Sequence, residues 1–231
     1  MLKTPYVIIF STMTIDGRIA SPTGYSKLSC PHDLKRLHSL RAEVNAVMVG
    51  ANTVIKDNPR LTVRLVKGRN PIRVIVDGKL RTPINARVYD VSEAETILIT
   101  STRAEKKKIN ALREKGVKII VLEEQGEGKI SLTKALTSLY DLGVRKILVE
   151  GGGKLNWSLI RENLVNEIRV TIAPYIFGNG VSVFQGEGYR NTKESPKLKL
   201  INVFKCECGN EIHVIYKVMS HANINSTHRL L

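Results

Sequence analysis

The sequence predicts an α/β fold in three layers, with a mostly parallel central sheet and antiparallel strands added near the C-terminus. Short apolar runs rich in β-branched residues alternate with segments of helical periodicity along most of the 231 residues. Neighbouring parallel strands need such crossover segments, which then cover both faces of the sheet. In the last quarter, strand-like runs follow one another without a helix between them, and we expect them to extend one edge of the sheet as antiparallel strands.

The strands of the parallel part are short and apolar, as buried strands are. We expect six of them, at residues 6–10, 46–49, 72–76, 96–100, 118–122 and 146–149. The C-terminal runs are at residues 167–176, 197–204 and 211–218. No low-complexity linker or internal repeat separates the two parts, so residues 1–218 are predicted to form a single domain. Residues 219–231 are polar and are expected to be a weakly ordered tail.

One helix is predicted between the fourth and fifth strands. Thr102 and Glu105 form a capping-box pattern at its start. Ile109 and Leu112 then lie on one face, and Gly116 provides a left-handed exit.

A second helix is predicted between the fifth and sixth strands. Ser131 caps its start and Gly143 stops it before the next strand. Its apolar stripe has spacings of three and four residues. The stripe consists of Leu132, Ala135, Leu136, Leu139 and Leu142.

The composition favours a globular protein of a reducing compartment. Hydrophobic residues make up 42% of the chain, which at this length provides a sizeable core without a metal or a disulfide. Cys30, Cys206 and Cys208 are odd in number, and the last two are too close in sequence for an ordinary disulfide. Their spacing implies no metal site either. Since no apolar run approaches the roughly 20 residues that span a bilayer, we expect a soluble, cytoplasmic protein without a membrane partner.

The formal net charge of +15 favours an anionic ligand. Nucleic acid, membrane phosphate and a small phosphorylated substrate all fit that description. Nucleic-acid-binding proteins usually concentrate their charge and interleave it with aromatic residues, whereas here the basic residues are dispersed and aromatic residues are only 5%. The charge alone therefore does not decide among the three.

Ligands of an open α/β sheet bind beyond the carboxyl ends of the strands. The most informative such junction is Gly151, Gly152, Gly153 and Lys154, which follows a buried strand and opens a helix. Glycines let the backbone approach a ligand, and the free N–H groups of a helix start attract phosphate, so a pyrophosphate fits there. The alternative is a turn for tight packing between strand and helix. Glu150, just before it, either accepts N–H donors from a heterocycle or is an exposed acid at a strand end.

A second junction follows the strand at 46–49. Thr53 is expected in the first turn of a helix, with Asp57 one turn later. Pro59 ends that helix and forces an extended segment that presents Leu61 and Arg64. An arginine held in this way suits bidentate phosphate binding. Judged from the sequence composition alone, Arg64 could equally well belong to an ion pair.

A third junction consists of Asp77, Gly78 and Lys79, again with a glycine at the end of a strand. None of the five histidines is in a metal-ligand or triad pattern, so hydrolytic and metal-dependent chemistry are disfavoured. These observations favour a nucleotide-like cofactor bound by backbone groups together with a phosphorylated substrate.

Nine short motifs follow one another along the chain. They are PYV at 5–7, MTIDGR at 13–18, LRA at 40–42, MVG at 48–50, TV at 53–54, DNPRLTVR at 57–64, VDG at 76–78, VEGGG at 149–153 and AP at 173–174. Taken together and in order, these motifs resemble those of the reductases of riboflavin biosynthesis. The resemblance extends from about residue 4 to residue 218 and is greatest to the stand-alone archaeal enzymes; the same module forms the C-terminal half of the bacterial bifunctional deaminase-reductase.

This resemblance implies a dihydrofolate-reductase-like fold, a homodimer, and NADPH as hydride donor, with NADH possible. The implied reaction reduces the ribosylamino side chain of 2,5-diamino-6-ribosylamino-4(3H)-pyrimidinone 5′-phosphate to the ribitylamino form. The positions that match cofactor contacts are Thr53, Asp57, Asp77, Gly78, Lys79, Gly151, Gly152, Gly153 and Lys154. Those that match substrate contacts are Ser26, Arg41, Leu61, Arg64 and Glu150.

No catalytic residue is identified by the sequence. Bacterial relatives often have a lysine where this chain has Phe10, so no lysine role carries over there. We therefore expect catalysis chiefly by positioning, worth about 7 to 11 kcal/mol in favourable cases, with water or a cleft residue relaying protons. Two alternatives remain at this point, which are a dihydrofolate-type reductase and a basic nucleic-acid-binding protein.

Overall fold

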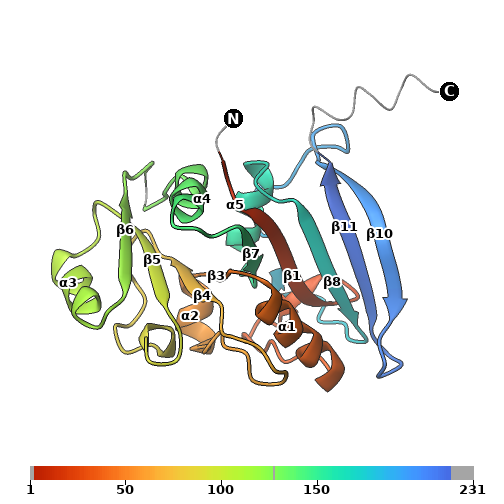
Figure 1. The fold of residues 1–231 in the computed structure, drawn as a ribbon. Helices are drawn as coiled ribbons and strands as arrows, with labels where there is room; N and C mark the ends of the chain where they lie inside the picture. Colours follow the sequence, from red (N-terminus) through yellow and green to blue (C-terminus); the bar gives the residue numbers. More distant parts are fainter. Residues whose placement is uncertain (1–2, 127, 220–231) are drawn as a thin grey trace.

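A nine-stranded sheet forms the centre of the molecule (Figure 1). The computed structural model describes residues 3–126 and 128–219. Across the sheet, the strands follow the order β10 (Lys197–Lys205), β11 (Ile212–Met219), β8 (Glu167–Ala173), β1 (Tyr6–Thr14), β7 (Lys146–Val149), β3 (Ala46–Gly50), β4 (Ile72–Val76), β5 (Thr96–Ser101) and β6 (Lys118–Leu122). A separate antiparallel pair joins β2 (Arg18–Ala20) to β9 (Val181–Ser182).

Helices cover both faces of the sheet, which confirms the three predicted layers. Ile8 and Ile9 are adjacent on β1 but belong to opposite cores, because successive side chains of a strand point to opposite faces. The core around Ile9 includes α4 (Leu132–Asp141) and α5 (Gly153–Arg161). The core around Ile8 includes α1 (Pro31–Glu43), α2 (Ala51–Asp57) and α3 (Lys106–Glu114), and a short 3-10 helix, η1 (Arg87–Tyr89), packs on the same side.

The predicted parallel strands are confirmed, but the predicted direction of β8 is wrong. β8 pairs in parallel with β1 and antiparallel with β11, so only β10 and β11 are antiparallel additions. The physical reason is the connection that precedes β8. Because α5 carries the chain from the end of β7 back across the sheet, the next strand starts at the same edge as β7 and runs parallel to it.

The predicted helix ends are partly confirmed. Ser131 caps α4 by accepting the backbone N–H of Lys134 at 3.3 Å, and Gly116 has a left-handed φ of +86°. The capping box before α3 is wrong, because α3 begins only at Lys106 and Thr102 lies in a preceding turn, where its N–H bonds to the carbonyl of Leu122. Leu142 also departs from the predicted stripe, since α4 ends at Asp141 and Leu142 is 54% exposed.

The last strand extends one residue further than the sequence predicted. Met219, assigned from the sequence to the tail, is the last residue of β11 and pairs with Lys197. The rest of the predicted tail, residues 220–231, lies outside the described residues. Within the part of the chain that the structure describes, no helix is long and apolar enough to cross a membrane.

Candidate active site

A cleft of about 1240 Å³ opens where β3, β4 and β7 end, beside residues 10–12 of β1. Small-ligand sites usually measure about 300–1,000 Å³, so this cleft has room for two ligands side by side. Residues 19–20 of β2 and 181 of β9 contribute to its wall. Most of the residues singled out in the sequence line it. They are Ser26, Arg41, Thr53, Asp57, Leu61, Asp77, Gly78, Lys79, Glu150, Gly152, Gly153 and Lys154.

The three glycines between β7 and α5 serve different purposes. Gly151 has a φ of +101°, which favours glycine, and its carbonyl accepts the N–H of Gly50 at 3.1 Å. A Cβ on Gly153 would lie 2.3 Å from the carbonyl oxygen of Ser182, so that glycine allows tight packing. A Cβ on Gly152 would meet only the Thr53 hydroxyl, at 3.4 Å. Gly153 therefore fits the packing interpretation of this turn, and the open space at Gly152 leaves room for a ligand.

The first turn of α5 is available to an anion. Gly152 is its N-cap, and no described side chain caps it, whereas α1 and α4 are capped by Cys30 and Ser131. The first N–H groups of an α-helix have no partner within the helix, and they carry the positive end of its dipole. With Gly152, Gly153 and the exposed Lys154 all lining the cleft, this end of α5 fits a phosphate group.

At the second junction, α2 begins directly after β3 and places Thr53 in its first turn. Asn58 ends the helix with a left-handed φ of 40°, just before Pro59. Asp57 is the last helical residue and faces the cleft, where burial raises its pKa and the neighbouring Lys56 partly offsets the effect. Thr53 and Asp57 thus lie one turn apart on the same wall.

At the third junction, Asp77, Gly78 and Lys79 mainly make contacts within the protein. Asp77 is 2% exposed, and its carboxylate accepts the backbone N–H of Thr82 at 2.8 Å. A Cβ on Gly78 would lie 1.9 Å from the carbonyl oxygen of Gly128, so glycine is needed for this loop to pack against β4. Lys79 packs along the same Gly128. The carboxylate of Asp77 and the glycine after it therefore have structural roles that the sequence did not indicate.

Arg41 and Glu150 form a two-pronged ion pair at the floor of the cleft. Nε and Nη2 of Arg41 donate to the two oxygens of Glu150, each at 2.6 Å, and the side chains are 7% and 10% exposed. Nη1 of Arg41 also donates to the carbonyl of Thr62 at 2.9 Å. Burial opposes the charge of Arg41, but Glu150 outweighs it and raises the pKa of Arg41. Neither interpretation of Glu150 from the sequence anticipated this, because its acceptors are already directed at Arg41.

The segment after Pro59 places its two predicted residues differently. Leu61 is 2% exposed, has a φ of +57° and lines the cleft. Arg64 is exposed and is not among the lining residues, and its Nη1 donates to the hydroxyl of Thr62 at 2.7 Å. Burial, followed by the positive charges of Arg41 and Arg60, lowers the pKa of Arg64. Arg41 and Arg60 have carboxylate partners in Glu150 and Glu93. Arg64 has none among the described residues, so its charge is the one that favours an anion beside the cleft.

His38 was missed by the sequence analysis. This residue of α1 is 4% exposed, and its Nδ1 accepts the backbone N–H of Arg64 at 2.8 Å. Burial and the charges of Arg41 and Arg64 lower its pKa to about 4, so it is neutral at pH 7. His38 thus fixes the segment that carries Arg64, although no sequence motif marks it.

A chain of hydroxyl groups connects the cleft to a buried carboxylate, and it was missed as well. Ser29, which lines the cleft, donates to Thr12 at 2.8 Å, and Thr12 donates to Asp33 at 2.7 Å. Asp33 is fully buried and also accepts the hydroxyl of Thr171 at 2.7 Å. Because the hydroxyl protons point toward the carboxylate, the oxygen of Ser29 presents acceptor capacity to the cleft.

The fold and the cleft define an α/β protein with a ligand-sized cleft at the carboxyl ends of a mostly parallel sheet. The chain belongs to the RibD C-terminal domain family, which it matches over residues 5–213.

The chain is also similar to named proteins of riboflavin biosynthesis. The chain is 38% identical over 219 residues to the 2,5-diamino-6-ribosylamino-4(3H)-pyrimidinone 5′-phosphate reductase of Methanothermobacter thermautotrophicus, covering 93% of this chain and 98% of that protein. It is 37% identical to the protein of the same name from Aquifex aeolicus, covering 88% and 92%. Against the riboflavin biosynthesis protein RibD of Aquifex aeolicus, identity is 39%, and 93% of this chain covers 58% of that one.

Solved structures show the same fold. The deaminase/reductase of Thermotoga maritima superposes with a TM-score of 0.77 at 31% identity, over 94% of this chain and 57% of that one. Dihydrofolate reductase from Enterococcus faecalis superposes with a TM-score of 0.54 at 13% identity, which is a likeness of fold alone. The predicted dihydrofolate-reductase-like architecture is therefore confirmed.

Proposed function

We propose that the protein is the NADPH-dependent reductase of riboflavin biosynthesis that converts 2,5-diamino-6-ribosylamino-4(3H)-pyrimidinone 5′-phosphate to its ribitylamino form. The observation that carries this proposal is the match to the Methanothermobacter reductase of that name, at 38% identity over 98% of its length. A match over nearly the whole length of a stand-alone relative supports the same single activity for this chain.

The cofactor is proposed to bind along the three junctions at the strand ends. The open space at Gly152 fits a pyrophosphate, and the start of α5 with Lys154 supplies donors to it. Thr53, Asp57, Asp77, Gly78 and Lys79 continue the same wall. NADPH is preferred over NADH in this proposal because the wall is rich in cations for the additional phosphate, namely Lys56, Lys79, Arg81, Lys129, Lys154 and Arg161.

The substrate is proposed to bind on the opposite side of the cleft, near Ser26, Leu61 and the Arg41–Glu150 pair. Arg64 lies three residues after Leu61 on an exposed segment, and its charge, which has no carboxylate partner among the described residues, supports its role as the 5′-phosphate ligand. Arg41 is saturated by Glu150 and Thr62, so its role is to hold Glu150 and the floor of the cleft in place.

Catalysis is proposed to depend chiefly on positioning. When bound, the nicotinamide supplies a hydride for the former anomeric carbon of the ring-opened imine, and a proton from water completes the reduction. Ser29 would accept a hydrogen bond from a hydroxyl of the sugar, since its own proton is directed to Thr12. Asp33, held by Thr12 and Thr171, fixes that direction.

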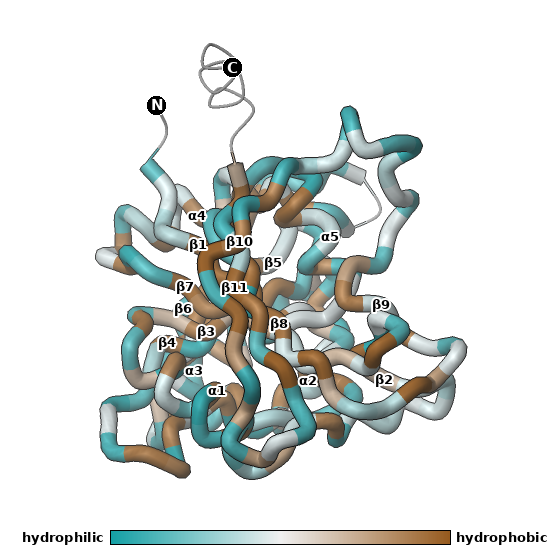
Figure 2. The backbone as a smooth tube through the Cα atoms, turned by 90° about the vertical axis from the view of Figure 1, so that its right-hand side faces the viewer, coloured by the Kyte–Doolittle hydropathy of each residue, from teal (hydrophilic) through white to brown (hydrophobic). Residues whose placement is uncertain are grey.

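A second copy of the chain is proposed to cover β10, giving a homodimer. Every residue of this edge strand is exposed, and Figure 2 shows apolar segments along the β10 side of the sheet. Leu198, Leu200, Ile201 and Val203 are 44–55% exposed, and an uncovered apolar edge promotes non-specific pairing. Sedimentation of Leu200→Lys beside the wild type tests this.

The protein is proposed to act in the cytoplasm, because its three free cysteines fit a reducing compartment.

The activity is tested by following NADPH oxidation with the phosphorylated ribosylaminopyrimidinone as substrate. Dihydrofolate serves as the comparison, because the fold is shared but dihydrofolate lacks a ribose phosphate. We expect NADPH oxidation with the phosphorylated pyrimidine and none with dihydrofolate. Turnover with dihydrofolate alone, or salt-sensitive binding to nucleic acid without any effect of NADPH, would instead support one of the two alternative functions.

A further inference from the structure

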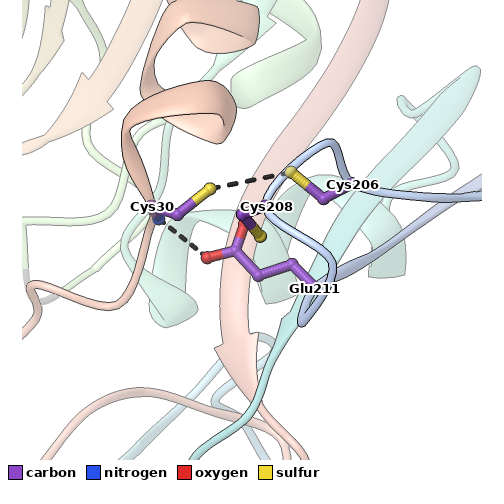
Figure 3. Close-up of side chains that lie close together, drawn as sticks. All are labelled: Cys30, Cys206, Cys208 and Glu211. Atoms are coloured by element: carbon purple, nitrogen blue, oxygen red, sulfur yellow. Dashed lines mark hydrogen bonds between the residues drawn. The ribbon is translucent and has the colours of Figure 1, made fainter.

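Three cysteines and a glutamate lie together on the side of the molecule where α1 begins (Figure 3). Cys30 is the N-cap of α1, whereas Cys206, Cys208 and Glu211 belong to the turn between β10 and β11. One sulfur or oxygen atom from each lies within 4.8 Å of every other. The sequence analysis predicted no metal site, because Cys30 and Cys206 are 176 residues apart and only the fold brings them together.

The spacing of two of these sulfurs fits tetrahedral coordination. The Sγ atoms of Cys30 and Cys206 are 3.6 Å apart. Two thiolates on one tetrahedral zinc ion, each at about 2.3 Å from it, are about 3.8 Å apart. A disulfide needs about 2.05 Å, so the two sulfurs are at the separation of metal ligands and not of a covalent pair.

Glu211 provides an independent observation. It is 2% exposed, and its Oε1 accepts the backbone N–H of Cys30 at 2.7 Å. Its Oε2 is fully buried and has no hydrogen-bond partner among the described residues. A buried carboxylate oxygen without a partner carries a free-energy penalty that a bound cation removes. In Figure 3 this carboxylate lies between the start of α1 and the cysteines of the turn.

The two other metal-binding side chains nearby already have hydrogen-bond partners. Asp33 and His213 also lie near Glu211, but Asp33 already accepts from Thr12 and Thr171, and Nδ1 of His213 is engaged with Thr171 and Arg36. Arg36 also provides a positive charge close to Cys206 and Glu211, which offsets the excess negative charge of three thiolates and a carboxylate around a divalent ion.

We propose that Cys30, Cys206, Cys208 and Glu211 bind one zinc ion. Zinc is the best match because it is borderline-soft, accepts thiolate and carboxylate ligands together and favours four-coordinate tetrahedral sites. Four protein ligands close the coordination sphere, so the ion is structural. It fastens the turn between β10 and β11 to the start of α1, the helix that carries His38 and Arg41 toward the cleft.

The test compares metal content and stability of the reduced, full-length protein and three variants. Each protein is stripped with a chelator, reloaded with Zn²⁺ or Co²⁺, desalted and measured by elemental analysis, visible absorption and thermal unfolding. Cys208→Ser and Glu211→Gln each remove one ligand. Glu207→Gln is the matched control, because this acid is in the same turn but its side chain is 84% exposed and outside the cluster.

We expect about one zinc per chain in the wild type and in Glu207→Gln, with the intense visible bands of tetrahedral cobalt-thiolate after cobalt loading. Removing the metal should lower the Tm of both by about 10 °C, since the binding free energy of a structural ion adds to folding. Cys208→Ser and Glu211→Gln should each bind zinc at least tenfold more weakly, and the cobalt bands should weaken most in Cys208→Ser.

Three results would overturn the proposal. The first is a wild type that binds no zinc and shows only the pale spectrum of octahedral cobalt, a result that needs no variant to fold. The second is equal zinc affinity in the wild type, Cys208→Ser and Glu211→Gln. The third is peptide mapping that finds a disulfide between Cys30 and Cys206 in metal-free protein purified from the cell without reductant.

Discussion

Arg41 and Glu150 form a charged pair that is almost entirely removed from water, and each stabilises the other there. Such a pair contributes little net stability compared with an apolar pair of similar volume, but removing one partner leaves the other charge buried and unpaired. The two residues are 109 positions apart, so no local sequence pattern could have shown their contact. At the scale of residues, both were predicted to lie at the ligand site, but their ion pair with each other was not predicted.

Glu150→Gln tests this interdependence. We expect a loss of about 3 to 5 kcal/mol in the free energy of unfolding, because the guanidinium of Arg41 stays buried without its counter-charge. Urea unfolding followed by circular dichroism measures it, with Glu114→Gln on the exposed face of α3 as the control. Equal stability of the two variants would show that Arg41 reaches solvent or another acid instead.

Gly152→Val tests the backbone approach to the cofactor. The added side chain enters the open space beside Thr53, so we expect NADPH affinity to fall at least about tenfold while the fold persists. Fluorescence titration gives the Kd, and thermal unfolding shows whether the variant is folded. A folded variant with unchanged NADPH affinity would remove Gly152 from the cofactor site.

His38 predicts a dependence of stability on pH. Its pKa is about 4 in the folded protein, against an ordinary value of 6.5. Between these values the unfolded chain binds a proton that the folded protein does not, so stability is fully present above pH 6.5 and falls as the pH decreases toward 4. We expect His38 to account for about 1 to 3 kcal/mol of this loss. His213 acts in the same direction, because burial also lowers its pKa.

The variant His38→Asn separates the two histidines. Asparagine keeps an acceptor for the N–H of Arg64 but does not titrate, so the unfolding free energy should fall less between pH 6.5 and 4 than in the wild type. Chemical unfolding at several pH values measures the difference. Parallel curves for the two proteins would mean that His38 is already protonated or exposed in the folded state.

At the scale of elements, the local patterns were sufficient for the parallel strands and for α4, where the apolar period and the Ser131 cap agree. They were insufficient for the direction of β8 and for the start of α3. The direction of β8 depends on which edge of the sheet the chain reaches after α5, a tertiary property. Glu105, and not Thr102, precedes α3, because residues 102–104 turn back toward the end of β6 instead of starting a helix.

The extended segment after Pro59 is the element proposed to hold the substrate phosphate. Arg64→Ala should lower kcat/KM by about ten- to a hundredfold, because a charge-assisted contact worth about 1.5 to 3 kcal/mol is lost, and Arg64→Lys should recover only part of it. Arg69→Ala, an exposed arginine of the same loop, is the control and should behave like the wild type. All three variants should bind NADPH normally.

The kinetic constants of Arg64→Ala distinguish the two phosphates. If this variant loses NADPH affinity and keeps its substrate KM, Arg64 binds the cofactor's 2′-phosphate. Arg60 would then be the first candidate for the substrate phosphate, because its ion pair with Glu93 is open to solvent whereas the ion pair of Arg41 with Glu150 is buried.

At the scale of the whole molecule, the net charge of +15 is compatible with both nucleic acid and small anions. The fold places several of the lysines and arginines around one cleft at the strand ends, where we propose that a dinucleotide and a phosphorylated substrate bind together. The sequence predicted this edge of the sheet because a glycine follows a predicted parallel strand at three junctions, two of which lead into a helix. The hydroxyl chain to Asp33 could not be predicted, since its members come from β1, the loop before α1, α1 itself and β8 and meet only in the folded protein.

The central claim is that this protein transfers a hydride from NADPH to the ribosylamino carbon of its substrate. The most direct measurement uses NADPH that carries deuterium at both C4 positions, followed by mass spectrometry of the product. The account predicts a ribitylaminopyrimidinone phosphate with one deuterium on the first carbon of its side chain. A reduced product without deuterium, or labelled tetrahydrofolate and no labelled pyrimidine when both substrates are present, would contradict it.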